Sequence, residues 1–195
     1  MAVLDQVAKR DVDMIFVGDS ITHFFEKEDG KAVWDKYYAP RKAVNLGFSG
    51  DKTQNVLWRL QNGEIECISP KLAVVLIGTN NCIENNSKEI ADGVIAICQE
   101  LRNELPQTKI LLLAIFPRAD FQHKIKPEAN AEASRLFSEI ADNKWIYFMD
   151  INNKFLNKDG TLLKDIFPDN LHPNAQGYEI WAQAMEPTIS ELMGK

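Results

Sequence analysis

Five short runs of apolar residues along the chain predict buried strands. Each run consists almost wholly of β-branched, aliphatic or aromatic residues, as expected for strands covered by helices on both faces. The runs are 14–17, 43–46, 72–77, 110–115 and 145–149.

Longer segments between and after these runs have helical spacing. Apolar residues recur every three or four positions over 87–105, 127–141 and 174–193, which predicts three helices. Ser87 is the expected N-cap of the first, and Pro106 lies just past its end. Because strands and helices alternate, the chain is predicted to form a parallel α/β sheet with helices on both faces. Such sheets bind ligands beyond the carboxyl ends of their strands.

Composition limits the remaining choices. A chain of 195 residues with 45% hydrophobic side chains and no internal repeat predicts a single domain over 1–195. Its formal charge of −6 argues against nucleic acid or anionic lipid as a partner and favours a neutral or weakly polar substrate. Cys67, Cys82 and Cys98 have no metal-ligand spacing and are expected to be free thiols.

No apolar run reaches the roughly 20 residues that a membrane span needs. The first residues also lack the apolar core of a signal peptide. As it stands, the chain is expected to be soluble and cytoplasmic, or exported if a leader preceded Met1.

Polar residues and glycines follow the first three predicted strands, over 18–22, 47–51 and 78–81. Asp169 and His172 stand three residues apart, just before the last predicted helix. Since the carboxyl ends of parallel strands share one edge of the sheet, these groups are expected to lie together.

A serine hydroxyl needs an imidazole to take its proton and a third group to orient that imidazole. Ser20, His172 and Asp169 supply these groups, while the N–H groups of Ser20 and Gly50 and the side chain of Asn80 are candidate oxyanion donors. Taken singly, each feature has a plainer interpretation, such as a capping serine or a surface ion pair. Their joint occurrence favours a hydrolytic site.

The ordered set Gly18-Asp19-Ser20, Gly50, Gly78-Thr79-Asn80 and Asp169-x-x-His172 resembles the four sequence blocks of the SGNH hydrolases, also called GDSL esterases and lipases. The resemblance spans about residues 14–182. Further stretches resemble the branch that contains platelet-activating-factor acetylhydrolase subunits and bacterial acetyl esterases, namely 45–53, 56–60, 63–64, 116–118 and 172–178.

This resemblance implies a three-layer flavodoxin-like fold with five parallel strands in the order 2-1-3-4-5, with no cofactor and no metal. It assigns Ser20 as the nucleophile, His172 as the base and then acid, and Asp169 as the orienting carboxylate. It also allows a homodimer, for which the residues give no separate argument.

Substrate contacts are expected at Asp19, Ile21, Thr79 and Leu171. Ile21 stands where the family's four-letter name has Leu, so we expect a reshaped acyl pocket with unchanged chemistry. Arg118, after a strand-end Phe-Pro, could line the site or pair with an acid. The four tryptophans are expected in the core: Trp34, Trp58, Trp145 and Trp181.

The favoured function is metal-independent hydrolysis of short acyl esters, with acetylated sugars or polysaccharides as the expected substrates. Phospholipid-type or other small lipid esters are the alternative within the same chemistry. No apolar insertion is long enough to build an acyl tunnel. Two other classes stay open. One is an inert flavodoxin-like binding module, although the Asp19 carboxylate would repel the phosphate of a nucleotide or flavin. The other is a metal-dependent deacetylase using Asp19, His23, Asp169 and His172.

Overall fold

The chain forms one five-stranded parallel sheet in the order β2-β1-β3-β4-β5, seen in a computed structural model that describes residues 11–119 and 127–194. This confirms the expected fold class and strand order. The strands are β1 (Met14–Gly18), β2 (Ala43–Gly47), β3 (Leu72–Leu76), β4 (Lys109–Leu113) and β5 (Ile146–Met149). The helices are α2 (Ser20–His23), α3 (Lys31–Tyr37), α4 (Thr53–Gln61), α5 (Ser87–Glu104), α6 (Pro127–Ser138) and α7 (Ala175–Met193).

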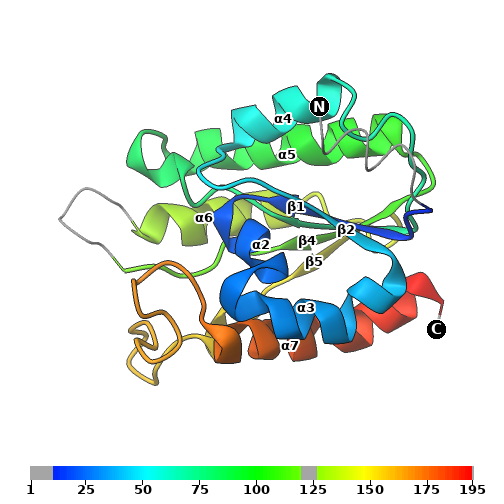
Figure 1. Cartoon of the computed structure of the whole chain (residues 1–195). Coiled ribbons are helices and arrows are strands. Elements are labelled where there is room, and N and C mark those ends of the chain that lie inside the picture. Colours follow the sequence, from blue (N-terminus) through cyan, green and yellow to red (C-terminus); the bar gives the residue numbers. More distant parts are fainter. Residues whose placement is uncertain (1–10, 120–126, 195) are drawn as a thin grey trace.

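The two faces of the sheet bury different kinds of side chain. In β1, Ile15 and Val17 join an aliphatic cluster, whereas Met14 and Phe16 join a cluster rich in aromatic rings. This alternation follows from the two-residue period of a strand. Residues of α4, α5 and α6 complete the aliphatic side, and residues of α3 and α7 complete the aromatic side. Figure 1 shows α4 and α5 above the sheet and α3 and α7 below it.

The predicted strands differ from the observed ones by one or two residues at their ends, but the helices required more correction. Ser87 is the first residue of α5 and not its N-cap. Asn86 caps the helix, because its side chain accepts from the N–H of Glu89 at 3.0 Å while the Glu89 carboxylate accepts from the N–H of Asn86 at 2.9 Å. Helix α6 ends at Ser138 and not at 141, and the apolar spacing did not single out α2, α3 or α4.

The tryptophan prediction was partly wrong. Trp34 and Trp181 are buried, but Trp58 on α4 is 64% exposed and Trp145 is half-buried under the guanidinium of Arg102. Cys67, Cys82 and Cys98 are free thiols, the first exposed and the other two buried. Within the described ranges, no helix is both long and apolar enough to cross a membrane.

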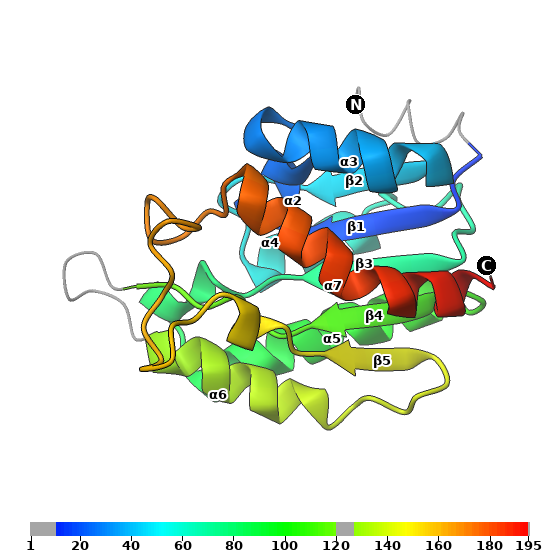
Figure 2. The ribbon, with the colours of Figure 1, turned by 90° about the horizontal axis from the view of Figure 1, so that it is seen from below.

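All five strands are parallel, so their carboxyl ends share one edge. In Figure 2 the arrowheads point toward the end of the molecule where the orange segment before α7 lies. That segment carries Asp169 and His172 to the same edge as the turns after β1, β2 and β3.

Candidate active site

Ser20 is presented by a tight turn between β1 and α2. Asp19 caps α2, its carboxylate accepting from the N–H of Ile21 at 3.0 Å. Gly18 is required by space, because a Cβ there would collide with the side chain of Thr22 and the carbonyl of Leu76. Ser20 is thereby the first residue of the helix, only 5% exposed.

His172 lies on a loop that is fixed by Asp169 and by the start of α7. One Asp169 oxygen accepts from the N–H groups of Leu171 at 2.9 Å and His172 at 2.7 Å. The loop ends at Asn174, whose side chain caps α7 by accepting from the N–H of Gly177 at 3.1 Å. The backbone of this loop is therefore set locally, before any contact with Ser20.

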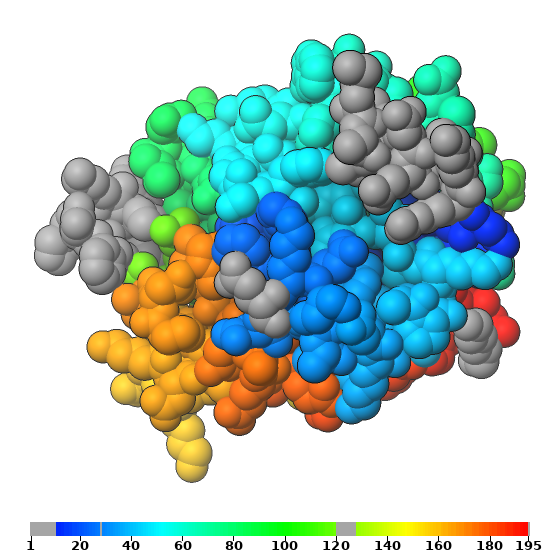
Figure 3. All heavy atoms as spheres, viewed as in Figure 1, coloured from blue at the N-terminus to red at the C-terminus, as the bar shows by residue number. Residues whose placement is uncertain are grey.

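The two segments meet through a chain of hydrogen bonds. His172 Nε2 lies 2.8 Å from Ser20 Oγ, and His172 Nδ1 lies 2.6 Å from the second oxygen of Asp169. An ionised carboxylate only accepts, so Nδ1 carries the proton that faces Asp169 and Nε2 is left to accept from the hydroxyl. In Figure 3 the orange segment before α7 lies against the blue segment after β1. Such a chain can move the hydroxyl proton to the imidazole.

The remaining candidate donors flank β1. Gly50 lies in the turn after β2, and Asn80 in the turn after β3, and both strands pair with β1. Gly50 has φ +85° and no atom within 4 Å of a built Cβ, so backbone conformation, and not space, calls for glycine there. The Asn80 amide donates to the carbonyl of Asp51 at 2.9 Å, which joins the two turns.

The pKa values of two carboxyl groups next to these hydrogen bonds are shifted in opposite directions. Burial raises the pKa of Asp19 to about 7; the Ile21 N–H opposes this shift, the charge of Asp51 adds to it and Arg118 opposes it. Partial burial would also raise the pKa of Asp169, but hydrogen bonds from the His172 N–H, the imidazole and the Leu171 N–H outweigh it and lower that pKa.

The four expected substrate contacts do not share one surface. Asp19, Ile21 and Thr79 are each 1% exposed, and Ile21 packs in the aromatic cluster. Leu171 is only partly buried against that cluster. Leu171 is the one of the four with substantial surface to offer.

The sequence left two roles open for Arg118, lining the site or pairing with an acid, and gave no role to Asn130. Both side chains bond Thr79 in the turn after β3. Arg118 donates to the Thr79 carbonyl at 3.1 Å, and Asn130 donates to the Thr79 hydroxyl at 3.3 Å. The Tyr178 hydroxyl donates to the carbonyl of Ile21 at 2.9 Å, tying α7 to α2. The sequence placed Tyr178 in the apolar spacing of 174–193 and in the family-like stretch 172–178, but it did not predict the contact of the hydroxyl.

Of the four residues of the metal alternative, Asp169 and His172 are in contact, at 2.6 Å, but no third ligand joins them among the described residues. The described residues contain no cluster of three His, Cys, Asp or Glu side chains with the geometry of a metal site. The ring of His23 lies against the rings of Phe24 and Phe48 instead.

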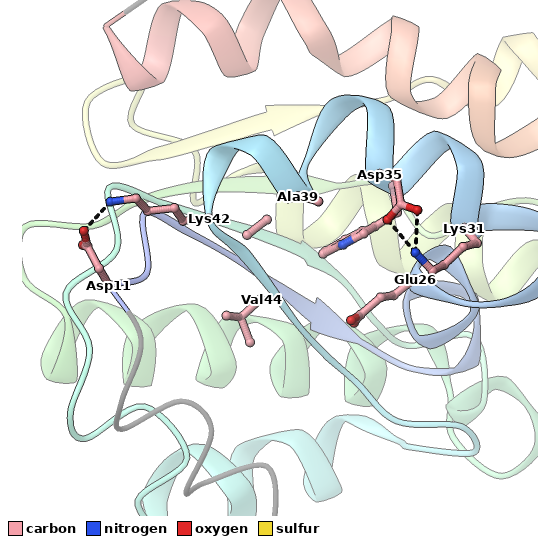
Figure 4. Close-up of a pocket in the computed structure, with 9 residues that line it drawn as sticks. Asp11, Glu26, Lys31, Asp35, Ala39, Lys42 and Val44 are labelled. Atoms are coloured by element: carbon pink, nitrogen blue, oxygen red, sulfur yellow. Dashed lines mark hydrogen bonds and ion pairs between the residues drawn. The ribbon is translucent and has the colours of Figure 1, made fainter.

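A cavity lies beside Asp169 and His172. About 340 Å³ in volume, it is lined by Phe24, Asp29, Pro168, Asp169, His172, Pro173 and Tyr178. Another cavity, of about 420 Å³, lies between α3 and the amino end of β2 and is lined by none of the residues of the candidate site. Figure 4 shows that its lysines already pair with its aspartates, Lys42 with Asp11 and Lys31 with Asp35.

Fold and site together define a parallel-sheet hydrolase, and the chain belongs to the GDSL-like lipase/acylhydrolase family, whose model matches residues 16–180. The resemblance seen in the sequence is thus confirmed. The protein is accordingly a carboxylic ester hydrolase.

Known relatives and structures agree with this assignment. The alpha2 subunit of platelet-activating factor acetylhydrolase IB from Homo sapiens is 34% identical over 186 residues, covering 94% of this chain and 79% of the relative. A GDSL-like lipase from Bacteroides thetaiotaomicron has a TM-score of 0.75 at 20% identity, covering 94% of this chain and 90% of that one. A carbohydrate acetylesterase from Sinorhizobium meliloti has a TM-score of 0.71 at 17% identity, covering 93% and 99%. At these identities, the two structures show the shared fold alone.

Proposed function

We propose that the protein hydrolyses short acyl esters, acetyl esters above all, through an acyl-enzyme on Ser20. The observation that carries the proposal is the hydrogen-bonded chain from Ser20 Oγ through His172 to Asp169. Because Ser20 is only 5% exposed, the space around its hydroxyl is confined, which favours a small acyl group.

In the proposed mechanism, His172 acts first as a base and then as an acid in each half-reaction. His172 takes the Ser20 proton as Oγ attacks the ester carbonyl, and Asp169 stabilises the imidazolium. The oxyanion accepts hydrogen bonds from the N–H groups of Ser20 and Gly50 and from the Asn80 amide. His172 then protonates the leaving alcohol, and a water molecule repeats the sequence on the acyl-enzyme. The Ser20 N–H is available because the first N–H groups of a helix have no partner within it.

Acetylated sugars or polysaccharides are the proposed natural substrates. The leaving alcohol must lie near His172, and the cavity there is bordered by two carboxylates, Asp29 and Asp169, which disfavour an anionic alcohol. The formal charge of −6 acts in the same direction. An acetylated phospholipid is the second candidate, supported by the identity to the acetylhydrolase alpha2 subunit.

The test compares the parent with Ser20→Ala on p-nitrophenyl acetate, butyrate and octanoate, with EDTA present. We expect acetate to be cleaved fastest and Ser20→Ala to lose about 10⁴-fold or more of kcat/KM. Ser138→Ala, at a half-buried serine on α6 whose hydroxyl bonds only the Arg135 carbonyl among the described contacts, is the control. Comparable activity of Ser20→Ala and the parent would remove Ser20 as the nucleophile. Acetylated oligosaccharides assayed against acetylated phospholipid then decide the alcohol.

A further inference from the structure

The turn that carries Gly50 needs support from its neighbours. Gly50 itself is exposed, and nothing packs near its Cβ position. The backbone of the turn is closed by two hydrogen bonds, from the N–H of Phe48 to the Gly18 carbonyl at 3.1 Å and from the N–H of Asp51 to the Phe48 carbonyl at 3.1 Å. The direction of the Gly50 N–H thus depends on what holds residues 46–51.

Arg59 on α4 supplies that support with one guanidinium. Its Nε and Nη2 donate to one Asp51 oxygen at 3.1 and 2.7 Å, and Nη2 also donates to the Leu46 carbonyl at 3.3 Å. The same group lies 4.3 Å from the centre of the Phe48 ring. Nη1 donates to the buried carboxylate of Glu64. The Arg59 side chain is only 15% exposed, so water competes little for these bonds.

Asp51 passes this restraint to both outer donors of the candidate oxyanion hole. It directly follows Gly50, and its carbonyl accepts from the Asn80 amide at 2.9 Å. A shift of Asp51 would therefore turn the Gly50 N–H and release Asn80 together. We infer that Arg59 is a positioning residue of the oxyanion hole, acting through Asp51 on Gly50 and Asn80; this inference rests on the proposed function.

Lysine cannot replace Arg59 in this role. The planar guanidinium donates four hydrogen bonds in different directions to three residues, and a single ammonium cannot reproduce that geometry. Arg59→Lys nevertheless keeps the positive charge between Asp51 and Glu64. It is thus the variant that loosens the turn without leaving two buried carboxylates unpaired.

The experiment measures kcat and KM for p-nitrophenyl acetate, with sites counted by complete labelling with a fluorophosphonate. We expect Arg59→Lys to lose about 10- to 100-fold in kcat/KM, mainly in kcat, with KM within about threefold of the parent. Combining it with Asn80→Ala should cost less than the product of the single losses, because both act on one oxyanion hole. A purely structural role would lower the number of labelled sites and the Tm, while leaving the rate per labelled site unchanged.

Arg41→Lys is the matched control. Its side chain is 16% exposed and paired with Glu186 on α7, at the far end of β2 from the site, so its rate per labelled site should match the parent. If Arg59→Lys does not fold, Asp51→Asn cuts the same link and should show the same loss in kcat. If a folded Arg59→Lys or Asp51→Asn variant has the parent's rate per labelled site, the inference is overturned and the proposed function still stands. An active Ser20→Ala overturns the proposed function and the inference with it.

Discussion

The two segments of the candidate active site are held in place in different ways. Ser20 and its neighbour Asp19 lie just past the carboxyl end of β1, 5% and 1% exposed, beside the aromatic cluster that includes Ile21. His172 and Asp169 sit on a loop, and the Asp169 side chain is 53% exposed. The first segment is held by burial, and the second by a local net of hydrogen bonds.

The comparison explains why two aspartates near one site have opposite pKa shifts. Asp19 lies in a region with too few donors to offset burial, so its neutral form is favoured. Asp169 receives three donors while still touching solvent, so its charged form is favoured. A carboxylate that must stabilise an imidazolium needs the second setting.

Removing the imidazole tests the exposed segment most severely. We expect His172→Ala to lower kcat/KM by about 10⁴- to 10⁶-fold, because no other group can take the Ser20 proton. The Tm should change little, since the loop is held by Asp169 and Asn174. The control is His23→Ala, whose half-buried ring packs on Phe24 and Phe48. Near-parent activity for His172→Ala, with loss for His23→Ala, would reverse the assignment.

Asp169→Asn should have a smaller effect. The imidazole stays in place, but an amide NH₂ facing Nδ1 favours the wrong tautomer, so a loss of about 10²- to 10⁴-fold in kcat/KM is expected. Because the Asp169 pKa is lowered in the folded state, its stabilising contribution is present above its unfolded pKa and is lost as pH falls through the folded pKa. The Tm difference between parent and variant should therefore shrink below about pH 4. A difference that grows in acid would contradict this.

Asp19→Asn should have the smallest effect on rate and a visible one on stability. The folded pKa of about 7 lies above the ordinary 3.8, so the folded chain retains a proton that the unfolded chain releases, and stability falls as pH rises between them. Asparagine keeps the cap on α2 and removes this titration. Urea unfolding at pH 5, 6, 7 and 8 should show the variant gaining on the parent by up to about 1.4 kcal/mol per pH unit, levelling off above pH 7. A constant difference would show that Asp19 does not titrate in this window.

The fold could be predicted from the sequence because its signal is local. Strands covered on both faces are continuous apolar runs, and the runs 72–77 and 110–115 clearly predict such strands. The helices over 53–61 and 31–37 were missed because each is short and buries only a few side chains. The exposure of Trp58 could not be predicted from its residue type, because an aromatic residue on a surface helix can face water.

The candidate site could be located in sequence but not its supports. Ser20 and His172 follow from residue type and place relative to predicted strands. Nothing in the sequence singles out Arg59. Its proposed role depends on its bond to the Asp51 carboxylate, eight residues earlier, and on the bond from the Asn80 amide to the Asp51 carbonyl. Contacts of this kind arise only when the turns are brought to one edge.

The hydroxyl of Tyr178 also has a consequence for biosynthesis. Helix α7 begins three residues after His172, and its Tyr178 hydroxyl bonds the helix that starts with Ser20. Ser20 and His172 themselves are 152 residues apart in the chain. A nascent or clipped chain that lacks α7 would still contain His172 but would lose the Tyr178 contact that ties the following helix to α2. If this contact is needed to hold His172 against Ser20, we expect ester turnover to begin only when the last helix docks, so that turnover would report complete folding.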